Sequence, residues 1–494
     1  MLQRSKTLLA TLLVLVLCFS FAAPAMPAFA APNPDADPAV ATTKAAITKI
    51  LEVPYGTTVP NINFVFTVKA IEIDGAAATT SNMPIVGSTT SGTTGTFTVE
   101  FGKSTPDEKL LSSVDASVSN PDSNGNSLWY IETPDFFKDV NWENYSTGVY
   151  EYEITETSSN WTQHNSIVPD WVDHLNMSKA KYHMWVYVSQ GAPTQESDGM
   201  GGFVTIPGKH VIKHIGVVQI TTDAGDPGDE EAKIDPTPGG DHTNYFTSQM
   251  IFTNEYWKEI ITHPALGGAM NVSKTVAGSM KDTSLYFSFQ MTINAPVLDD
   301  GTVPTTVRAL IYERPTDTSP WVSVAAADLS AAAKNNVSGA TVTATADPNF
   351  YYSPYITITY GQAVTFKLKH NQMLVFPEII VGSTYTITET GTPSYAPQVT
   401  VTSNGVAATS PKLAKGASLA IPSTSTIAGT NGKLFFGEKT NSAAFLNDKG
   451  DITETGLDLN DLPFVGLILL AAGGIVAFAL ISRRRKNSYD ENEN

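Results

Sequence analysis

Three kinds of polar residue lie where apolar residues are expected, and they do so twice in the same order. They are Lys49, Glu156 and Asn254 in the first half of the chain and Lys274, Glu389 and Asn447 in the second. Each lies on the apolar face of a predicted β-strand, because strand side chains alternate between two faces. Burying an unpartnered charge is strongly unfavourable, so two matching sets indicate a function.

Lysine, glutamate and asparagine brought together in an apolar core can form an isopeptide bond without an enzyme. Burial lowers the pKa of the lysine, so its amine becomes neutral and nucleophilic, and raises the pKa of the glutamate, so its carboxyl becomes protonated. We expect this carboxyl to hydrogen-bond to the asparagine carbonyl and to relay protons while the amine attacks and ammonia leaves. Proximity in a packed core can lower the barrier by about 7–11 kcal/mol.

The predicted strands that hold these residues repeat as well. In the segment 148–157, tyrosine and isoleucine side chains share a face with Glu156, and the segment 383–390 presents Glu389 in the same way. Each lysine lies in the first strand of its half, each is followed by a Phe-x-Phe strand, and each asparagine ends a Phe-x-Asn strand. The chain is therefore a tandem repeat.

A simpler interpretation is that each lysine extends its ammonium group to the surface and forms only a salt bridge with the glutamate. That explanation suffices for a single lysine. Six inward-facing polar positions in matching order favour the covalent bonds.

The repeat resembles the streptococcal pilin isopeptide-linkage domain over residues 41–260 and 268–450. The resemblance implies an all-β chain with two tandem immunoglobulin-like (CnaB/pilin-type) β-sandwich domains, the first carrying long insertions. The implied bonds are Lys49–Asn254 assisted by Glu156 and Lys274–Asn447 assisted by Glu389. The chain contains no Tyr-Pro-Lys pilin motif.

Both ends of the chain carry targeting signals. Residues 1–30 read as a secretory signal peptide with a basic start, an apolar core and a small-x-small cleavage site. Residues 462–481 form an apolar run long enough to span a bilayer as a helix. The basic residues that follow predict that 482–494 is cytoplasmic.

The start of the apolar run resembles a sortase sorting signal, whose pattern is Leu-Pro-x-Thr-Gly. The matching residues are Leu462, Pro463, Phe464, Val465 and Gly466, with valine in the place of threonine. The resemblance implies cleavage between the last two of these residues and transfer to peptidoglycan. A plain membrane anchor is the alternative.

Composition excludes several classes of function. The formal charge of −18 argues against binding nucleic acid or an anionic membrane surface. The single cysteine, Cys18, lies in the signal peptide, so the mature chain has no disulfide, thiolate metal site or cysteine nucleophile. The acidic segment 223–235 lacks the ligand order of an EF-hand, and we expect no metal and no cofactor.

Enzyme motifs are weak in this sequence. His210 and His214 have the spacing of a zinc helix but lie in a β-branched run, and Ser178-x-x-Lys181 lacks the companion motifs of the penicillin-recognising enzymes. We interpret these four as ordinary surface residues. No enzyme activity is expected beyond autocatalytic bond formation.

The sequence therefore predicts a structural protein of a Gram-positive cell surface, either a pilin-like subunit or a stalk. Its expected partners are the membrane, a sortase, peptidoglycan and other pilin subunits. The alternative is an adhesin that binds a host or glycan ligand through the loops 76–97 and 157–245.

Overall fold

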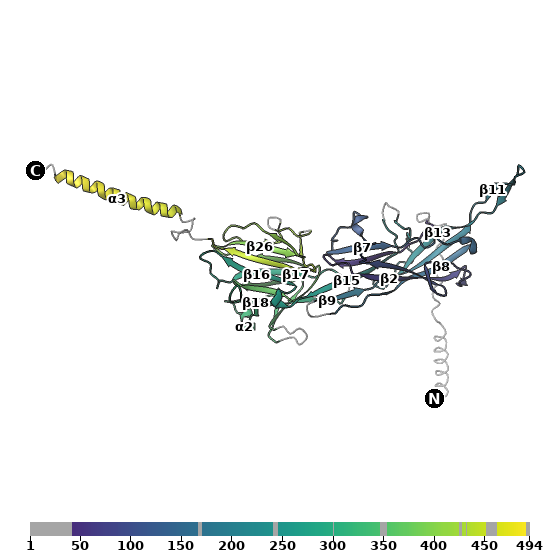
Figure 1. Ribbon diagram of the computed structural model, residues 1–494, viewed down its shortest axis with the longest axis horizontal. Helices are drawn as coiled ribbons and strands as arrows, with labels where there is room; N and C mark the ends of the chain where they lie inside the picture. Colours follow the sequence, from purple (N-terminus) through teal and green to yellow (C-terminus); the bar gives the residue numbers. More distant parts are fainter. Residues whose placement is uncertain are drawn as a thin grey trace, which may run out of the picture.

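The chain is mostly β-structure arranged in several sheets (Figure 1). The computed structural model describes residues 42–165, 170–240, 246–299, 301–345, 353–423, 427–430, 432–450 and 462–490. The signal peptide expected at 1–30 lies outside the described residues.

The N-terminal half contains two sheets that share one core. The first sheet contains, in spatial order, β15 (Ile251–Ile261), β1 (Thr48–Pro54), β7 (Asn126–Glu132) and β6 (Lys109–Leu110), with β9 (Asp170–Asn176) paired to β15. The strand β24 (Glu378–Ile380), which comes from the C-terminal half, also pairs with β15. The second contains β14 (Lys233–Ile234), β13 (His210–Thr221), β10 (Lys181–Gln190), β8 (Gly148–Ser159), β2 (Ile62–Ile73), β5 (Thr94–Phe101) and β4 (Ser88–Ser91), with β3 (Ala76–Ala77) paired to β2. Leu51 and Phe252 from the first sheet pack in one cluster with Phe66 and Tyr152 from the second.

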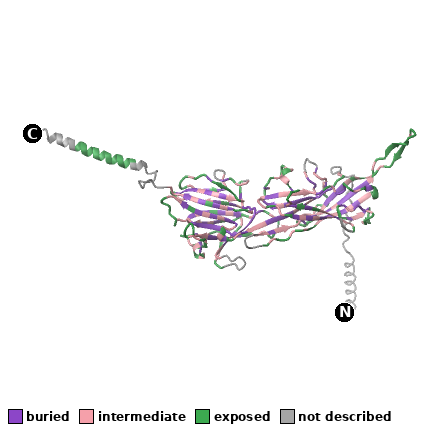
Figure 2. Ribbon diagram, viewed as in Figure 1, coloured by how far each residue is buried: buried purple, intermediate pink, exposed green. Residues whose placement is uncertain are grey.

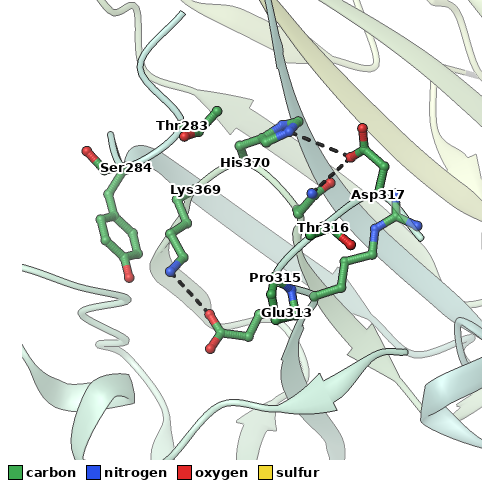
Figure 3. Close-up of a pocket in the computed structure, with 11 residues that line it drawn as sticks. Thr283, Ser284, Glu313, Pro315, Thr316, Asp317, Lys369 and His370 are labelled. Carbon is green, nitrogen blue, oxygen red and sulfur yellow. Dashed lines mark hydrogen bonds and ion pairs between the residues drawn. The ribbon is translucent and has the colours of Figure 1, made fainter. Parts of the chain in front are cut away.

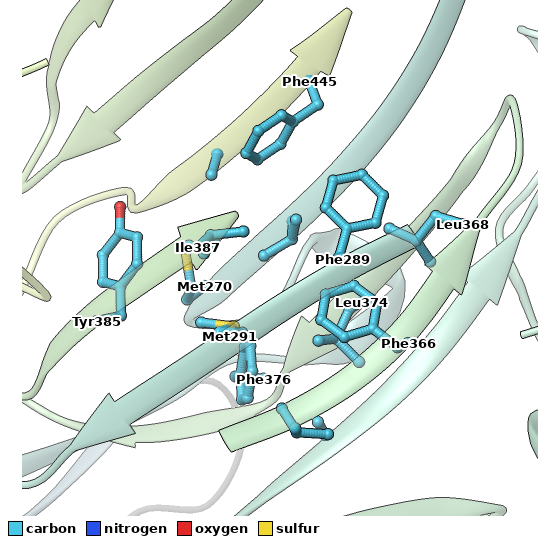
Figure 4. Close-up of a cluster of buried hydrophobic side chains, with 14 of the residues drawn as sticks. Met270, Phe289, Met291, Phe366, Leu368, Leu374, Phe376, Tyr385, Ile387 and Phe445 are labelled. Carbon is cyan, nitrogen blue, oxygen red and sulfur yellow. The ribbon is translucent and has the colours of Figure 1, made fainter. Parts of the chain in front are cut away.

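The C-terminal half repeats this arrangement. One sheet contains β20 (Thr341–Thr343), β21 (Tyr355–Thr359), β18 (Thr306–Glu313), β23 (Gln372–Phe376), β16 (Met270–Ala277), β30 (Ser442–Asp448), β26 (Ala396–Ser403) and β27 (Val406–Thr409), with β19 (Val322–Ser323) paired to β18. The other contains β22 (Ala363–Leu368), β17 (Phe287–Asn294), β25 (Thr384–Glu389) and β28 (Leu419–Ile421), with β29 (Leu434–Phe435) paired to β25. Figure 4 shows Phe289, Ile387 and Phe445 meeting in the core between them.

Helical structure is sparse. The sequence predicts a short helix at roughly 325–334, and the short α2 (Ala326–Ser330) forms there. Among the described residues, the other short helical turns are of the 3₁₀ type and span Leu111–Ser113, Trp142–Asn144 and Pro264–Leu266.

Apolar alternation explains these strands. In β2 every second residue from Ile62 to Ala70 is buried, and in β16 every second residue from Met270 to Val276. Figure 2 shows buried strands in the middle of both sandwiches and exposed loops around them. The predicted inward faces of β8 and β25 are confirmed, since their tyrosine and isoleucine side chains are buried.

Two expected loops contain strands instead. The Ser/Thr/Gly-rich segment 76–97 contains β3, β4 and the start of β5, and the segment 157–245 carries β9 to β14. The sequence predicts two of these strands, at 182–189 and 210–221, and β10 and β13 confirm them. The short strands β3 and β4 were not recognised because they pair at a sheet edge without the alternating apolar side chains that mark a half-buried strand.

The sequence predicts a short connector between the two halves at 257–268, and this prediction is wrong in its first part. Strand β15 continues to Ile261, and its residues 259–261 pair with β24 of the C-terminal half. One strand therefore belongs to both halves. Polar contacts reinforce the junction, since Glu438 accepts hydrogen bonds from Lys258 Nζ at 2.9 Å and from the backbone N–H of Thr58 at 2.8 Å.

A two-stranded hairpin extends from the end of the N-terminal half. It consists of β11 (Thr194–Ser197) and β12 (Phe203–Ile206), which pair only with each other. Figure 1 shows it projecting away from the body at the end remote from the C-terminal half. Met200 at its turn is 95% exposed and Phe203 is 71% exposed.

The apolar run expected at 462–481 lies in the helix α3 (Leu462–Asp490). Within the described parts of the chain, no helix is both long and apolar enough to span a membrane.

Replacing Gly382 by alanine should destabilise the junction. Gly382 has a φ of +84°, and a Cβ there would overlap Pro54 of the N-terminal half. Gly416 is the matched control, because its φ is +79° and the nearest atom to an added Cβ is 3.9 Å away. G416A should cost about 1–2 kcal/mol for backbone strain alone, and G382A about 1–3 kcal/mol more for the overlap.

Thermal unfolding of the full chain measures the difference. The G382A variant should melt several degrees below G416A. Equal melting temperatures would show that the approach of residue 382 to Pro54 does not constrain the junction.

Candidate functional site

The first lysine, glutamate and asparagine meet in the core of the N-terminal half. Lys49 of β1 and Asn254 of β15 belong to one sheet, and Glu156 comes from β8 of the facing sheet. Lys49 Nζ lies 3.1 Å from Oε2 of Glu156, and Asn254 Nδ2 donates a hydrogen bond to Oε1 at 2.9 Å. All three side chains are buried. The glutamate thus contacts both other residues, one with each oxygen.

The second set meets in the C-terminal half. Lys274 of β16 and Asn447 of β30 again share a sheet, with Glu389 on β25 opposite. Lys274 Nζ lies 2.6 Å from Oε1 of Glu389, and Asn447 Nδ2 donates to the same oxygen at 2.7 Å. All three residues are buried.

The two sites have the same strand register. The lysine and asparagine strands are parallel in both halves, with Leu51 opposite Asn254 and Val276 opposite Asn447. In each site the residue that pairs with the asparagine lies two positions after the lysine. The lysine therefore points to the same face of the sheet as the asparagine and is its diagonal neighbour. The sequence repeat therefore extends to the register of the lysine and asparagine strands.

The glutamates are placed by an equivalent register in the facing sheets. Phe66 pairs with Glu156 and Phe289 pairs with Glu389. The first phenylalanine of each Phe-x-Phe pair covers the lysine, with Nζ 4.7 Å from the ring centroid of Phe64 in the first site. In the second site the corresponding distance, from Lys274 Nζ to the ring of Phe287, is 4.3 Å. These rings exclude water from each site.

Burial opposes charge on both members of each pair. Desolvation lowers the pKa of Lys49 and of Lys274 to about 8, against the attraction of the neighbouring glutamate. Desolvation raises the pKa of Glu156 and of Glu389, against the attraction of the lysine. Neither lysine extends to the surface, so that form of the simpler interpretation is wrong, although both ion pairs that it requires are present.

The amide orientation differs from expectation. The carboxyl was expected to contact the asparagine carbonyl, but in both sites the amide nitrogen donates to the glutamate. An ionised carboxylate only accepts hydrogen bonds, so it selects this orientation. As a result, the nitrogen that would leave as ammonia faces the group that would protonate it. In the second site Glu389 Oε2 and Asn447 Oδ1 are buried without a hydrogen-bond partner among the described residues.

Ser178 was wrongly interpreted as a surface residue. It is 7% exposed, and its backbone N–H donates to Asn254 Oδ1 at 2.6 Å. Sequence pattern gave no signal for this contact, because it depends on a loop and not on an alternating strand. Lys181 pairs with Glu153, and His214 stacks on Tyr187.

The proposed sorting residues 462–466 form the first part of α3. They lie in a separate element from the two buried sites. Cleavage there stays a prediction.

A polar cleft of about 700 Å³ lies in the C-terminal half (Figure 3). Its polar side chains contact one another, with Lys369 Nζ 3.3 Å from Glu313 and Asn371 Nδ2 donating to Asp317 at 3.0 Å. The cleft is open and polar, in contrast to the dry Lys–Glu–Asn sites.

Comparison with known proteins gives a limited family match. A model described as a domain of unknown function, DUF7601, matches residues 268–418. Among proteins with curated descriptions, none matches the sequence.

Several solved structures are similar to this one. The major pilin of Streptococcus pyogenes is 17% identical, with a TM-score of 0.26 over 83% of this chain and 100% of the pilin chain. The T-13 major pilin of the same species is 13% identical, with a TM-score of 0.24 over 83% and 98%. A pilus-presented adhesin is 9% identical, with a TM-score of 0.16 over 82% and 99%.

If these sites form isopeptide bonds, the reaction should slow above pH 8. A neutral amine beside a protonated carboxyl contains as many protons as an ammonium beside a carboxylate, so pH does not interconvert these two states. Above the lysine pKa of about 8 the pair loses its proton, and the glutamate can no longer protonate the leaving nitrogen. The rate should then fall about tenfold per pH unit.

To test this, the full-length chain is isolated in an unfolded state without cross-links. It is then diluted into folding buffers of different pH. Mass spectrometry of the digested protein then follows each cross-linked peptide with time. A rate that keeps rising well above the lysine pKa, as expected for a free amine, would contradict a mechanism that needs the proton shared by the lysine and the glutamate.

Proposed function

We propose that this protein is a cell-surface structural subunit, pilin-like or stalk-like, with two immunoglobulin-like (CnaB/pilin-type) sandwiches each locked by an intramolecular isopeptide bond. The observation that carries the proposal is the pair of buried Lys–Glu–Asn sites with identical strand register. The proposed bonds join Lys49 to Asn254 and Lys274 to Asn447.

Each bond would form when the lysine amine displaces ammonia from the asparagine side chain. Starting from the neutral amine and the protonated carboxyl, lysine Nζ attacks asparagine Cγ while the glutamate gives its proton to Nδ2. The Cγ–Nδ2 bond breaks and ammonia leaves, and the resulting carboxylate takes up the proton that the attacking Nζ loses. Glu156 contacts the attacking and leaving nitrogens through different oxygens, which suits this relay. The product is a neutral amide, so the lysine no longer carries a charge in the core.

The bonds would carry tension along the molecule. Each joins the first strand of a sandwich to its last, so a pull between the ends passes through covalent links. The closed loops run from residue 49 to 254 and from 274 to 447. By analogy with disulfides, each would stabilise its sandwich by about 5 kcal/mol as an upper estimate.

We further propose that the protein is exported by residues 1–30 and held at the surface by its C-terminus. The apolar run at 462–481 would serve as a membrane anchor, with 482–494 inside the cell. Cleavage between Val465 and Gly466 by a sortase would transfer the protein to peptidoglycan or to other pilin subunits. The support is the order of sorting-like residues, apolar run and basic residues.

The intact mass of the mature protein should be lower than its sequence mass by two ammonia molecules, one for each bond. Glu156→Ala and Glu389→Ala should each restore one ammonia and lower the melting temperature, because the relay is lost while the strands remain paired. Glu153→Ala is the matched control, because Glu153 lies on the outward face of β8 and pairs with Lys181. An unmodified protein at its full sequence mass would reject the bonds.

A second function is favoured by the projecting hairpin. A hairpin of two short strands is marginally stable alone, and exposed apolar side chains at its turn are typical of a binding surface. The hairpin lies within the segment expected to bind ligands in an adhesin.

Binding of the full chain to immobilised matrix proteins and glycans tests this second function. The double variant M200S/F203S should abolish binding, and the control Q195S on the same hairpin should retain it. Absence of binding by the unmodified protein, or equal binding by all three, would exclude an adhesive role for the hairpin.

A further inference from the structure

We infer that the backbone N–H of Ser178 is an oxyanion donor for bond formation in the first site, and that Asp223 is the residue that positions it. The inference rests on the proposed function, because it concerns the rate of the Lys49–Asn254 reaction. It assigns a role to a loop that belongs to neither the lysine strand nor the glutamate strand.

The contact fixes the orientation of the reacting amide. Ser178 donates its N–H to Asn254 Oδ1 at 2.6 Å, and an N–H cannot accept a hydrogen bond. The amide oxygen therefore faces Ser178 and the nitrogen faces Glu156. The attacked group is held between a donor for its oxygen and a proton relay for its leaving nitrogen.

This donor lies where negative charge develops. When Lys49 Nζ attacks Cγ, the electrons of the carbonyl double bond move to Oδ1, which becomes an oxyanion until ammonia leaves. A donor that is already in place stabilises that charge without reorganisation, most strongly where water is excluded. Both Ser178 and Asn254 are buried. Removing one such donor costs about 10²- to 10³-fold in rate in acyl-transfer enzymes.

Asp223 holds the donor in position. Ser178 lies in the connection between β9 and β10, and its hydroxyl donates to Asp223 Oδ1. The same oxygen accepts the backbone N–H of Thr253 at 2.9 Å, and Thr253 directly precedes Asn254 in β15. The Lys179 N–H also donates to the backbone carbonyl of Asp223 at 2.9 Å. Asp223 therefore joins the loop that carries the donor to the strand that carries the acceptor.

The second site provides an internal comparison. Asn447 Oδ1 is buried and has no hydrogen-bond partner among the residues that the structure describes. A change at Ser178 or Asp223 should therefore alter the first bond and leave the second unaffected in the same molecule.

The test compares both bonds in full-length chain that folds from an unfolded, uncross-linked state. Ser178→Pro removes the N–H and should slow the first bond by about 100-fold or more, with the second bond unchanged. Ser178→Ala keeps the N–H but loses the hydroxyl contact with Asp223, so it should slow the first bond much less than Ser178→Pro and by about as much as Asp223→Ala. Asp223→Ala should slow the first bond by about tenfold, because a misplaced donor stabilises the oxyanion less. Asp223→Asn, which still offers an acceptor oxygen, should restore the rate.

The outcomes separate the two proposals. If S178P does not fold, the comparison of D223A with D223N decides. A general structural defect would affect both bonds, whereas a misplaced donor slows only the first bond, and D223N should restore the rate of that bond. Unchanged formation of the first bond in D223A and in folded S178P would overturn the role of Ser178 while leaving the isopeptide function intact. Absence of both bonds from the unmodified protein would instead overturn the proposed function itself.

Discussion

Removal of a lysine–glutamate pair from water is the constraint on which the rest of this structure depends. A buried ion pair is stable only if its geometry is good and its remaining hydrogen-bonding groups are satisfied. In the first site Glu156 uses one oxygen for Lys49 and the other for Asn254. The second site satisfies fewer groups, since Glu389 Oε2 is buried without a partner among the described residues. Conversion of the charged lysine into a neutral amide would relieve this cost in both.

The sandwich architecture supplies the dryness that this chemistry requires. Lysine and asparagine come from neighbouring parallel strands of one sheet, and glutamate comes from the sheet opposite, so the three meet only if the two sheets pack closely. Phenylalanine rings fill the space around them, with the rings of Phe66 and Phe252 5.1 Å apart in the first site and those of Phe289 and Phe445 5.2 Å apart in the second. The same aromatic residues therefore form the core and keep the reactive groups apart from water.

Local pattern was enough to predict that the six polar residues face inward, because alternation along a strand is a property of nearby residues. It could not predict what depends on distant segments. The contact of Ser178 with Asn254 joins residues 76 positions apart through a loop, and a loop has no periodicity. The continuation of β15 to Ile261 was missed because its partner β24 lies in the other half of the chain. The orientation of each asparagine amide could not be predicted from the sequence, because it depends on which donor or acceptor lies beside it.

The strand shared by the two halves has a consequence for how far the molecule can lengthen. With both cross-links in place, the shortest covalent path along the chain between them is the segment from Asn254 to Lys274. Fully extended, these twenty residues would reach only about 70 Å. Part of that slack is already used, because β15 is extended as far as Ile261 and pairs there with β24. The reserve of extension between the two sandwiches is therefore confined to the short turn that follows β15.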